Sequence, residues 1–240
     1  MGVFFQSPTA ASRYSKSRIH FHDQAIDVMR QLLTLKAPFP WALDVGCGTG
    51  HSTIALRALA TNVLGIDPSA AMLSEALPCE QVVYAKSSAE KMNMPDDSVQ
   101  LMTASQSFHW FNSRPFYLEC SRVLATDGNL FIYGHQLSHP CLDFFDEEFP
   151  SPYKQPSLNP VELDVFSLRF LKVTKYEKSV TLDLKQTIDY LLTMSAVEKA
   201  LEMLSLEDVE KKLMARLGPA FAHGPLTFQS AGQVWWLKKI

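Results

Sequence analysis

Cysteine is scarce in this 240-residue sequence, and its four cysteines suit neither a disulfide framework nor a zinc site. They form no C-x-x-C pair and have no histidine at zinc-ligand distance, so we expect reduced thiols and no metal centre. No apolar run approaches the roughly 20 residues of a membrane-spanning helix, and the N-terminus lacks the basic start and apolar centre of a secretory signal. These absences predict a soluble, cytoplasmic protein without a membrane span.

An excess of charge of either sign is also absent. The chain has 22 Lys and Arg against 25 Asp and Glu, a formal net charge of -3, and no basic run stands out. This balance disfavours a nucleic-acid partner. The length suits one α/β domain with a core that needs no disulfides, and we expect a monomer or a homodimer.

Short apolar runs alternate with amphipathic ones between Trp41 and His135. Strands that alternate with helices predict right-handed crossovers and a parallel sheet covered on both faces. Ligands of such sheets bind at the carboxyl ends of the strands. The predicted strands are 41–45, 62–67, 81–85, 99–104 and 129–134, and the helix-like segments are 52–60, 70–76, 89–92 and 114–124.

The flanking regions complete this sheet. A helix is expected over 23–35, and a loop-rich connection with one short helix over 136–160. The pattern then predicts an exposed strand at 169–182, helices at 184–194 and 206–217, and either two strand arms or one bulged strand at 225–239. The expected fold is a Rossmann-like, seven-stranded mixed sheet whose last strand is antiparallel, with helices on both faces and a small helical lid over the ligand end.

Three glycines at alternate positions follow the first predicted strand in the stretch LDVGCGTGH, residues 43–51. A dinucleotide-binding turn uses G-x-G-x-x-G, whereas here His51 takes the place of the third glycine. Asp44, just before the turn, would repel a pyrophosphate but could accept hydrogen bonds from the amino group of a cationic ligand. Asp67 ends the second strand, where a carboxylate can accept both hydroxyls of a ribose. The turn therefore predicts a nucleoside with a positive group and no phosphate.

Further motifs follow in order along the chain. They are D-V-G-C-G-T-G at 44–50, G-I-D-P-S at 65–69, S-A-E at 88–90, Q-S-F-H-W-F at 106–111 and R-V-L-x-x-x-G-N-L at 122–130. Together they resemble the class I S-adenosylmethionine-dependent methyltransferases, within the branch that includes trans-aconitate methyltransferase and the ubiquinone/menaquinone C-methyltransferases. The resemblance covers roughly residues 14–135. The run 18–22 departs from it, because it lacks both prolines of the branch's R-P-x-Y-P pattern.

The resemblance implies S-adenosylmethionine as cofactor and S-adenosylhomocysteine as product. The glycine turn would approach the methionine part and ribose, with Asp44 near the amino end and Asp67 at the ribose hydroxyls. Met72 and residues 88–90 would lie by the adenine, residues 105 and 106 along the methionine, and an N-terminal segment would close over the cofactor carboxylate. The implied cofactor-binding residues are Tyr14, Arg18, Asp44, Gly46, Gly48, Gly50, Asp67, Met72, Ser88, Ala89, Glu90, Ser105 and Gln106.

Structural roles remain open for several of these residues. Asp67 could cap the helix that follows it, since Pro68 and Ser69 come next. Met72 could belong to the core, and Tyr14 and Arg18 to a solvated surface segment.

Two histidines are candidate proton acceptors. His109 lies in the aromatic run after the fourth strand, where such density usually means packing, and His135 follows the fifth strand. A general base is needed only if the methyl acceptor arrives protonated, so a carboxylate acceptor would need neither histidine.

The resulting hypothesis is methyl transfer to a small, partly apolar acceptor through an O, N or C atom. The expected layout is an N-terminal lid and helix (1–40), a cofactor-binding core (41–135), a substrate cap with one strand (136–217) and a closing strand (218–240). Alternatives are a cofactor-binding module without methyl transfer and, disfavoured by His51, an NAD-dependent oxidoreductase. The apolar acceptor pocket is expected from Phe144, Phe145, Phe149, Tyr190, Leu191 and Met194.

Overall fold

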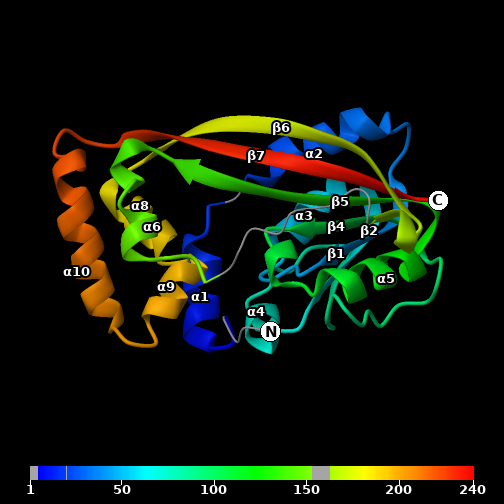
Figure 1. The fold of residues 1–240 in the computed structure, drawn as a ribbon, viewed down its shortest axis with the longest axis horizontal. Helices are drawn as coiled ribbons and strands as arrows, with labels where there is room; N and C mark the ends of the chain where they lie inside the picture. Colours follow the sequence, from blue (N-terminus) through cyan, green and yellow to red (C-terminus); the bar gives the residue numbers. More distant parts are fainter. Residues whose placement is uncertain (1–4, 20, 153–162) are drawn as a thin grey trace.

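A seven-stranded sheet forms the centre of the computed structural model, which describes residues 5–19, 21–152 and 163–240 (Figure 1). The strand order is β3-β2-β1-β4-β5-β7-β6, and β7 runs antiparallel to both of its neighbours. The fold class expected from the sequence is confirmed, and 225–239 proves to be one strand rather than two arms. The strands are β1 (Phe39–Val45), β2 (Ala60–Asp67), β3 (Val82–Lys86), β4 (Val99–Ser105), β5 (Leu124–Ser138), β6 (Leu168–Leu182) and β7 (Leu226–Lys239).

Helices cover both faces of the sheet. Met29 of α2 packs with Phe131 of β5 in one hydrophobic cluster, and Phe116 of α5 packs with Leu130 in another. Successive strand residues point to opposite faces, so α2 and α5 lie on opposite sides of β5. The helices are α1 (Pro8–Ser17), α2 (His22–Leu33), α3 (His51–Ala55), α4 (Ala70–Ser74), α5 (Ser113–Val123), α6 (Phe145–Glu148), α8 (Leu184–Leu191), α9 (Ser195–Ala200) and α10 (Leu206–Leu217).

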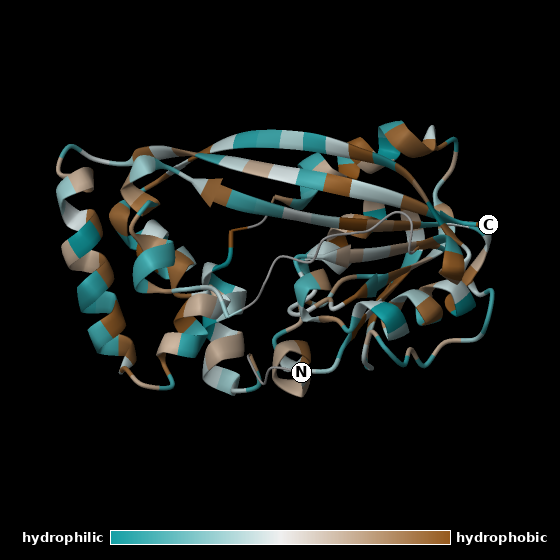
Figure 2. Ribbon diagram, in the orientation of Figure 1, coloured by the Kyte–Doolittle hydropathy of each residue, from teal (hydrophilic) through white to brown (hydrophobic). Residues whose placement is uncertain are grey.

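The helices α6, α8, α9 and α10 gather at the far ends of β5, β6 and β7, away from the chain's C-terminus (Figure 1). We call this group the cap. It has a hydrophobic cluster of its own, which includes Phe149, Leu191 and Leu213. The helix α10 alternates hydrophobic and hydrophilic residues, as expected of a helix with one buried face (Figure 2). None of the described helices is long and apolar enough to cross a membrane.

The expected helix at 89–92 is wrong. This segment is a turn closed by a bridge between Ser88 and Lys91, because side chains take the backbone groups that a helix would pair. The Ser87 hydroxyl donates to the carbonyl of Lys91 (2.9 Å), and the amide of Met92 donates to Glu119 Oε2 (2.6 Å).

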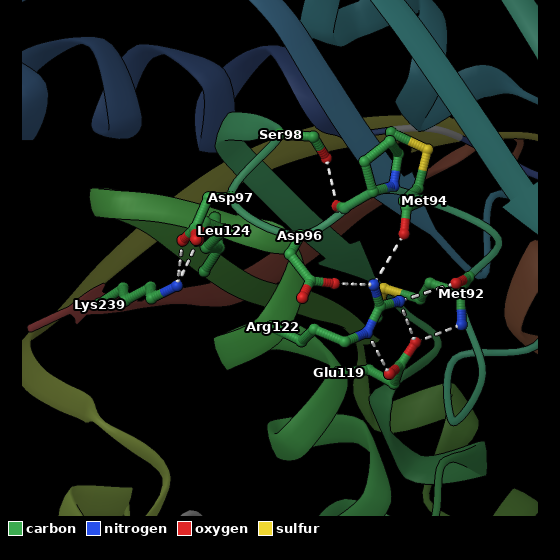
Figure 3. Close-up of polar contacts among 10 residues, drawn as sticks. Met92, Met94, Asp96, Asp97, Ser98, Glu119, Arg122, Leu124 and Lys239 are labelled. Atoms are coloured by element: carbon green, nitrogen blue, oxygen red, sulfur yellow. Dashed lines mark hydrogen bonds and ion pairs between the residues drawn. The ribbon is translucent and has the colours of Figure 1, made fainter.

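Arg122 of α5 fixes the loop after this turn (Figure 3). Its guanidinium donates to the carbonyls of Met92 (2.9 Å) and Met94 (2.7 Å), and pairs with Asp96 and Glu119, both at 2.7 Å. One side chain thereby holds the connection from β3 to β4 against α5.

The helix α1 is not among the elements expected from the sequence, which gave this region only as an N-terminal lid that contains Tyr14 and Arg18. Ser7 caps it through a hydrogen bond from the amide of Ala10 to its Oγ (3.1 Å), and Pro8 occupies the first helical position. Both are ordinary signals of a helix start.

Candidate functional site

The strands β1, β2 and β4 end at a cavity of about 760 Å³, and β5 runs along it; this volume is usual for small-molecule sites. The helix α1 and the segment that joins α8 to α9 supply the opposite walls. Most of the site residues expected from the sequence line this one cavity, although they come from widely separated parts of the chain. Those on its walls are Tyr14, Arg18, Gly46, Gly48, Asp67, Met72, Ser105, Gln106, His109 and His135.

The glycine turn needs its glycines for two reasons. Gly46, Gly48 and Gly50 have φ of +71°, +54° and +84°, values that side-chain-bearing residues rarely adopt. A Cβ on Gly46 would also lie 2.6 Å from Ser107 Cβ, and one on Gly50 would overlap the Tyr84 ring. Gly46 and Gly48 face the cavity, whereas Gly50 begins α3 and is not on the wall.

Asp67 lies at the carboxyl end of β2 on the cavity wall. Its Oδ2 accepts the Gly48 amide (2.9 Å) and its Oδ1 the Ser69 amide (2.8 Å), so the carboxylate ties the glycine turn to the start of α4. The cap of α4 is Ser69, whose Oγ accepts from the Met72 amide at 3.2 Å. Burial raises the pKa of Asp67. Each carboxylate oxygen keeps a second lone pair for a ligand hydroxyl.

Asp44 does not reach the cavity. It is fully buried, where Oδ2 accepts from the hydroxyls of Ser52 (2.6 Å) and Thr53 (2.8 Å) and Oδ1 from Thr103 (2.8 Å). Burial raises its pKa to about 6, against the effect of these three donors. Asp44 thus connects α3 and β4 to β1 beneath the turn. Its predicted contact with a ligand is not among these hydrogen bonds and stays a prediction.

Of the four residues expected near the adenine, one lines the cavity and three do not. Met72 is buried on the cavity wall, but Ser88, Ala89 and Glu90 are not among the residues that line it. Ala89 packs in the core below α5, and Glu90 Oε1 accepts the Asn112 amide (2.9 Å).

The helix α1 bridges the sheet and the cap. Arg13 forms an ion pair with Glu198 of α9, and its Nε donates to the carbonyl of Leu192 (3.0 Å). At the other side, the Ser69 hydroxyl donates to the carbonyl of Phe5 (2.8 Å), and the Phe5 ring meets Tyr14 edge-on.

Arg18 ends α1 within the cavity wall. Its Nη1 reaches Thr193 Oγ1 and Met194 Sδ, both at 3.2 Å, and its guanidinium lies 4.9 Å from the Tyr190 ring centre and 5.5 Å from that of Tyr14. No carboxylate in the described ranges forms an ion pair with it.

The two candidate histidines are neutral at pH 7. Burial and, to a smaller extent, the Arg18 charge lower the pKa of His109 to about 4. Burial, then Arg18 and His22, hold the pKa of His135 well below its ordinary value. Both ring nitrogens of His135 are buried, and neither has a hydrogen-bond partner among the residues that the structure describes.

Two other residues on the cavity wall, Gln106 and His22, make hydrogen bonds to β5 near His135. Gln106 adopts a left-handed φ of +52° at the end of β4, and its Nε2 donates to the backbone carbonyl of His135 (2.7 Å). His22, which the sequence gave no reason to choose, pairs through Nδ1 with the Tyr133 hydroxyl (3.1 Å). Burial lowers the pKa of His22 to about 3.

The cap wall differs from the apolar pocket expected from the sequence. Only Tyr190 and Met194 of the six chosen residues reach the cavity. Phe145, Phe149 and Leu191 are buried inside the cap, and Phe144 packs against them. The cap residues that line the cavity are Asp146, Pro150, Ser151, Tyr190, Thr193, Met194 and Ser195.

Comparison with known proteins identifies the central part of the chain. Residues 43–132 match the family described as "Methyltransferase domain". Over these residues the chain is similar to that family. The resemblance to class I methyltransferases is thereby confirmed, while the particular branch stays a prediction.

Similar proteins are known from sequence and structure. A provisionally named methyltransferase of Dictyostelium discoideum is 38% identical over 40% of this chain and 36% of its own length. A provisionally named S-adenosylmethionine-dependent methyltransferase of Saccharomyces cerevisiae is 28% identical over 42% of this chain and 38% of its own length. The chain therefore spans well under half of either relative. A solved type II methyltransferase structure, also provisionally named, from Anaeromyxobacter dehalogenans shares the fold, with a TM-score of 0.64, 21% identity and coverage of 89% of this chain and 94% of that one.

Proposed function

We propose that the chain is an S-adenosylmethionine-dependent methyltransferase that acts on a small-molecule acceptor. One observation carries the proposal: a single cavity joins the glycine turn and Asp67 to a second, polar wall on α1 and the cap. The methyltransferase domain match supports the cofactor, and the second wall supports an acceptor site rather than a cofactor-binding module alone.

The residues on the cavity wall fit this cofactor. Gly46 and Gly48 let a ligand approach the backbone closely, Asp67 keeps lone pairs for two ribose hydroxyls, and Met72 offers a flat apolar contact for an adenine. Asp44 lies beneath the turn, and its carboxylate disfavours a pyrophosphate there. When bound, S-adenosylmethionine supplies a methyl group activated by a sulfonium sulfur.

The chain's own contribution is to position the acceptor and to exclude water. The helix α1 roofs the cavity through Tyr14 and is tied to the cap by Arg13. His109 and His135 are neutral, so each ring has one N–H that can donate a hydrogen bond and one ring nitrogen that can accept one or take up a proton. The layout of lid, core, cap and closing strand expected from the sequence is kept as part of this proposal.

Calorimetric titration with S-adenosylhomocysteine tests the cofactor site. We expect micromolar binding to the wild type and at least about tenfold weaker binding to Asp67→Asn, since hydrogen bonds to charged groups contribute about 1.5–3 kcal/mol. The matched control is Asp146→Asn, the same substitution on the cap side of the cavity, which should bind as the wild type does. Absence of binding would exclude the proposal, and a preference for NADH would favour the oxidoreductase alternative.

A further inference from the structure

The strand β6 forms one edge of the sheet, and its outer side pairs with no strand in the described part of the chain. Figure 1 shows it as the uppermost strand of the view. The free N–H and C=O groups of such an edge are a template for another strand. Several side chains of β6 are also exposed, including Leu171 (39%) and Val173 (43%). The edge therefore offers backbone hydrogen-bonding groups and apolar side chains together.

The charged side chains in the middle of this strand have no partner of opposite charge. Those of the stretch 172–180 are Lys172, Lys175, Glu177 and Lys178, all of them exposed. None of them forms an ion pair with a described residue. Lysines on an edge strand oppose pairing with a second strand wherever like charges face each other. Their effect here depends on the register in which a second strand would lie.

Symmetry limits the registers open to a second copy of this chain. When two copies join their sheets through antiparallel edges, the two-fold axis is perpendicular to the sheet. Residues that lie directly opposite each other point to the same face, and side chains alternate between faces along each strand. The axis must therefore pass beside one residue, which then faces its own copy.

Tyr176 is the axis position that pairs the charges. With the axis there, Lys175 of each copy lies opposite Glu177 of the other, and no lysine of the stretch 172–180 lies opposite another lysine. An axis one residue earlier would place two copies of Lys175 face to face, and an axis one residue later would do the same to Glu177. The charges therefore favour one register over its neighbours rather than prevent pairing.

The side chain of Tyr176 leaves this axis free. It is buried, its hydroxyl donates to the carbonyl of Gly134 (3.1 Å), and a Cβ on Gly232 would overlap its ring. The ring thus lies over β7 and β5 of its own sheet, away from the outer edge. The strand is also in regular register with β7 from Lys172 onwards, so the stretches 172–180 of two copies could pair over roughly 30 Å.

We propose that two copies of this chain form a symmetric dimer through β6, with the strands antiparallel and the axis at Tyr176. The backbone hydrogen bonds supply affinity, and the two pairs of Lys175 with Glu177 fix the register. The partner is a second copy because the strand is complementary to itself in this register. One strand seam lies at the low end of the roughly 1,200–2,000 Å² that specific interfaces bury, so we expect a micromolar Kd. The proposal does not depend on the proposed function.

Sedimentation equilibrium of the full chain over the micromolar range tests the dimer. Glu177→Lys turns both opposite-charge pairs into like-charge pairs and should weaken dimerisation at least about tenfold, as should Lys175→Glu. The double exchange of Lys175→Glu with Glu177→Lys restores opposite charges in the same register, so its Kd should return to within about threefold of the wild type. The matched control is Glu210→Lys, at an exposed glutamate of α10, which changes the net charge equally and should dimerise as the wild type does.

Hydrogen exchange locates the interface. As the wild-type concentration rises, amides within 172–180 should become better protected, and this gain should be absent from Glu177→Lys at the same concentrations. A dimer without this protection would place the interface elsewhere and contradict the proposal. A wild type that stays monomeric would overturn it and leave the edge to another partner. Equal dimerisation of Glu177→Lys and the wild type, or no recovery in the double exchange, would overturn it as well.

Discussion

The two ends of the cavity are built by different means. At the sheet end, part of the wall is backbone: Gly46 and Gly48 lie on it, with Asp44 beneath the turn and Asp67 bound to the Gly48 amide. At the cap end, the wall consists of side chains that project from helices with a hydrophobic cluster of their own. The glycine positions of the sheet end tolerate little substitution. At the cap end, the side chains on the wall can be replaced while the hydrophobic cluster of the cap stays the same. The comparison therefore predicts that cofactor binding and acceptor choice respond to different mutations.

The largest effect is expected at the sheet end, for Gly46→Ala. The added Cβ would lie 2.6 Å from Ser107 Cβ, with φ at +71°, so both the turn and the end of β4 must shift. Steric overpacking of about 1–3 kcal/mol and a left-handed backbone of about 1–2 kcal/mol together predict a loss of about 4 kcal/mol in unfolding free energy. Urea unfolding measures this loss, and calorimetry should find no binding of S-adenosylhomocysteine.

The control lies in the cap. Gly218 ends α10 with a helical φ of -45°, and a Cβ there would meet nothing within 4 Å. Gly218→Ala should therefore leave both stability and cofactor binding within error or slightly improved. Equal tolerance at Gly46 and Gly218 would remove the distinction between the two ends.

The residues at the sheet end of the cavity could be predicted from the sequence because the signals for them are local. Three glycines and Asp67 follow apolar strands directly, and the alternation of strands and helices fixes which strand ends meet. The motif alone could not show the direction of the Asp44 side chain. That direction depends on Ser52, Thr53 and Thr103, which meet it only in the folded sheet.

The cap was harder to predict for a related reason. From the sequence, Phe145 and Phe149 could equally line a pocket or belong to the core. The pattern of a short amphipathic helix does not predict which neighbouring element covers its apolar face. The structure places both inside the cap, 6% and 1% exposed. Arg18 likewise carries a charge whose partner depends on how α1 docks, and no local spacing encodes that docking.

A smaller effect is expected for Phe149→Ala in the cap. The ring is 1% exposed and packs against Phe145 at 5.2 Å between centroids, so its removal should cost about 3–4 kcal/mol. The affinity for S-adenosylhomocysteine should stay within about twofold, because the ring does not line the cavity. Phe144→Ala, at a half-buried neighbour, should cost less in the same urea titration. A large loss of cofactor affinity in Phe149→Ala would mean that the two ends are not separable.

Acidification should change stability through two buried groups with opposite signs, and this is the smallest effect of the three. The pKa of His109 is lowered to about 4 in the folded protein, against about 6.5 in the unfolded chain. Its contribution to stability is therefore present above about pH 6.5 and is lost as the pH falls towards about 4. Asp44 has its pKa raised to about 6, so its contribution is present at low pH and is lost as the pH rises through 6. Between pH 7 and pH 5, His109 should therefore remove about 2 kcal/mol of unfolding free energy, while Asp44 adds about 1 kcal/mol.

Urea unfolding of the wild type and of two uncharged variants, at pH 7 and at pH 5, separates the contribution of His109 from that of Asp44. His109→Gln cannot take up a proton, so its loss of stability on acidification should be about 2 kcal/mol smaller than that of the wild type. Asp44→Asn lacks the opposing gain, so its loss should be about 1 kcal/mol larger. If both variants respond to pH as the wild type does, then neither group is held away from its ordinary pKa. The neutral state of the His109 ring would then lose its support.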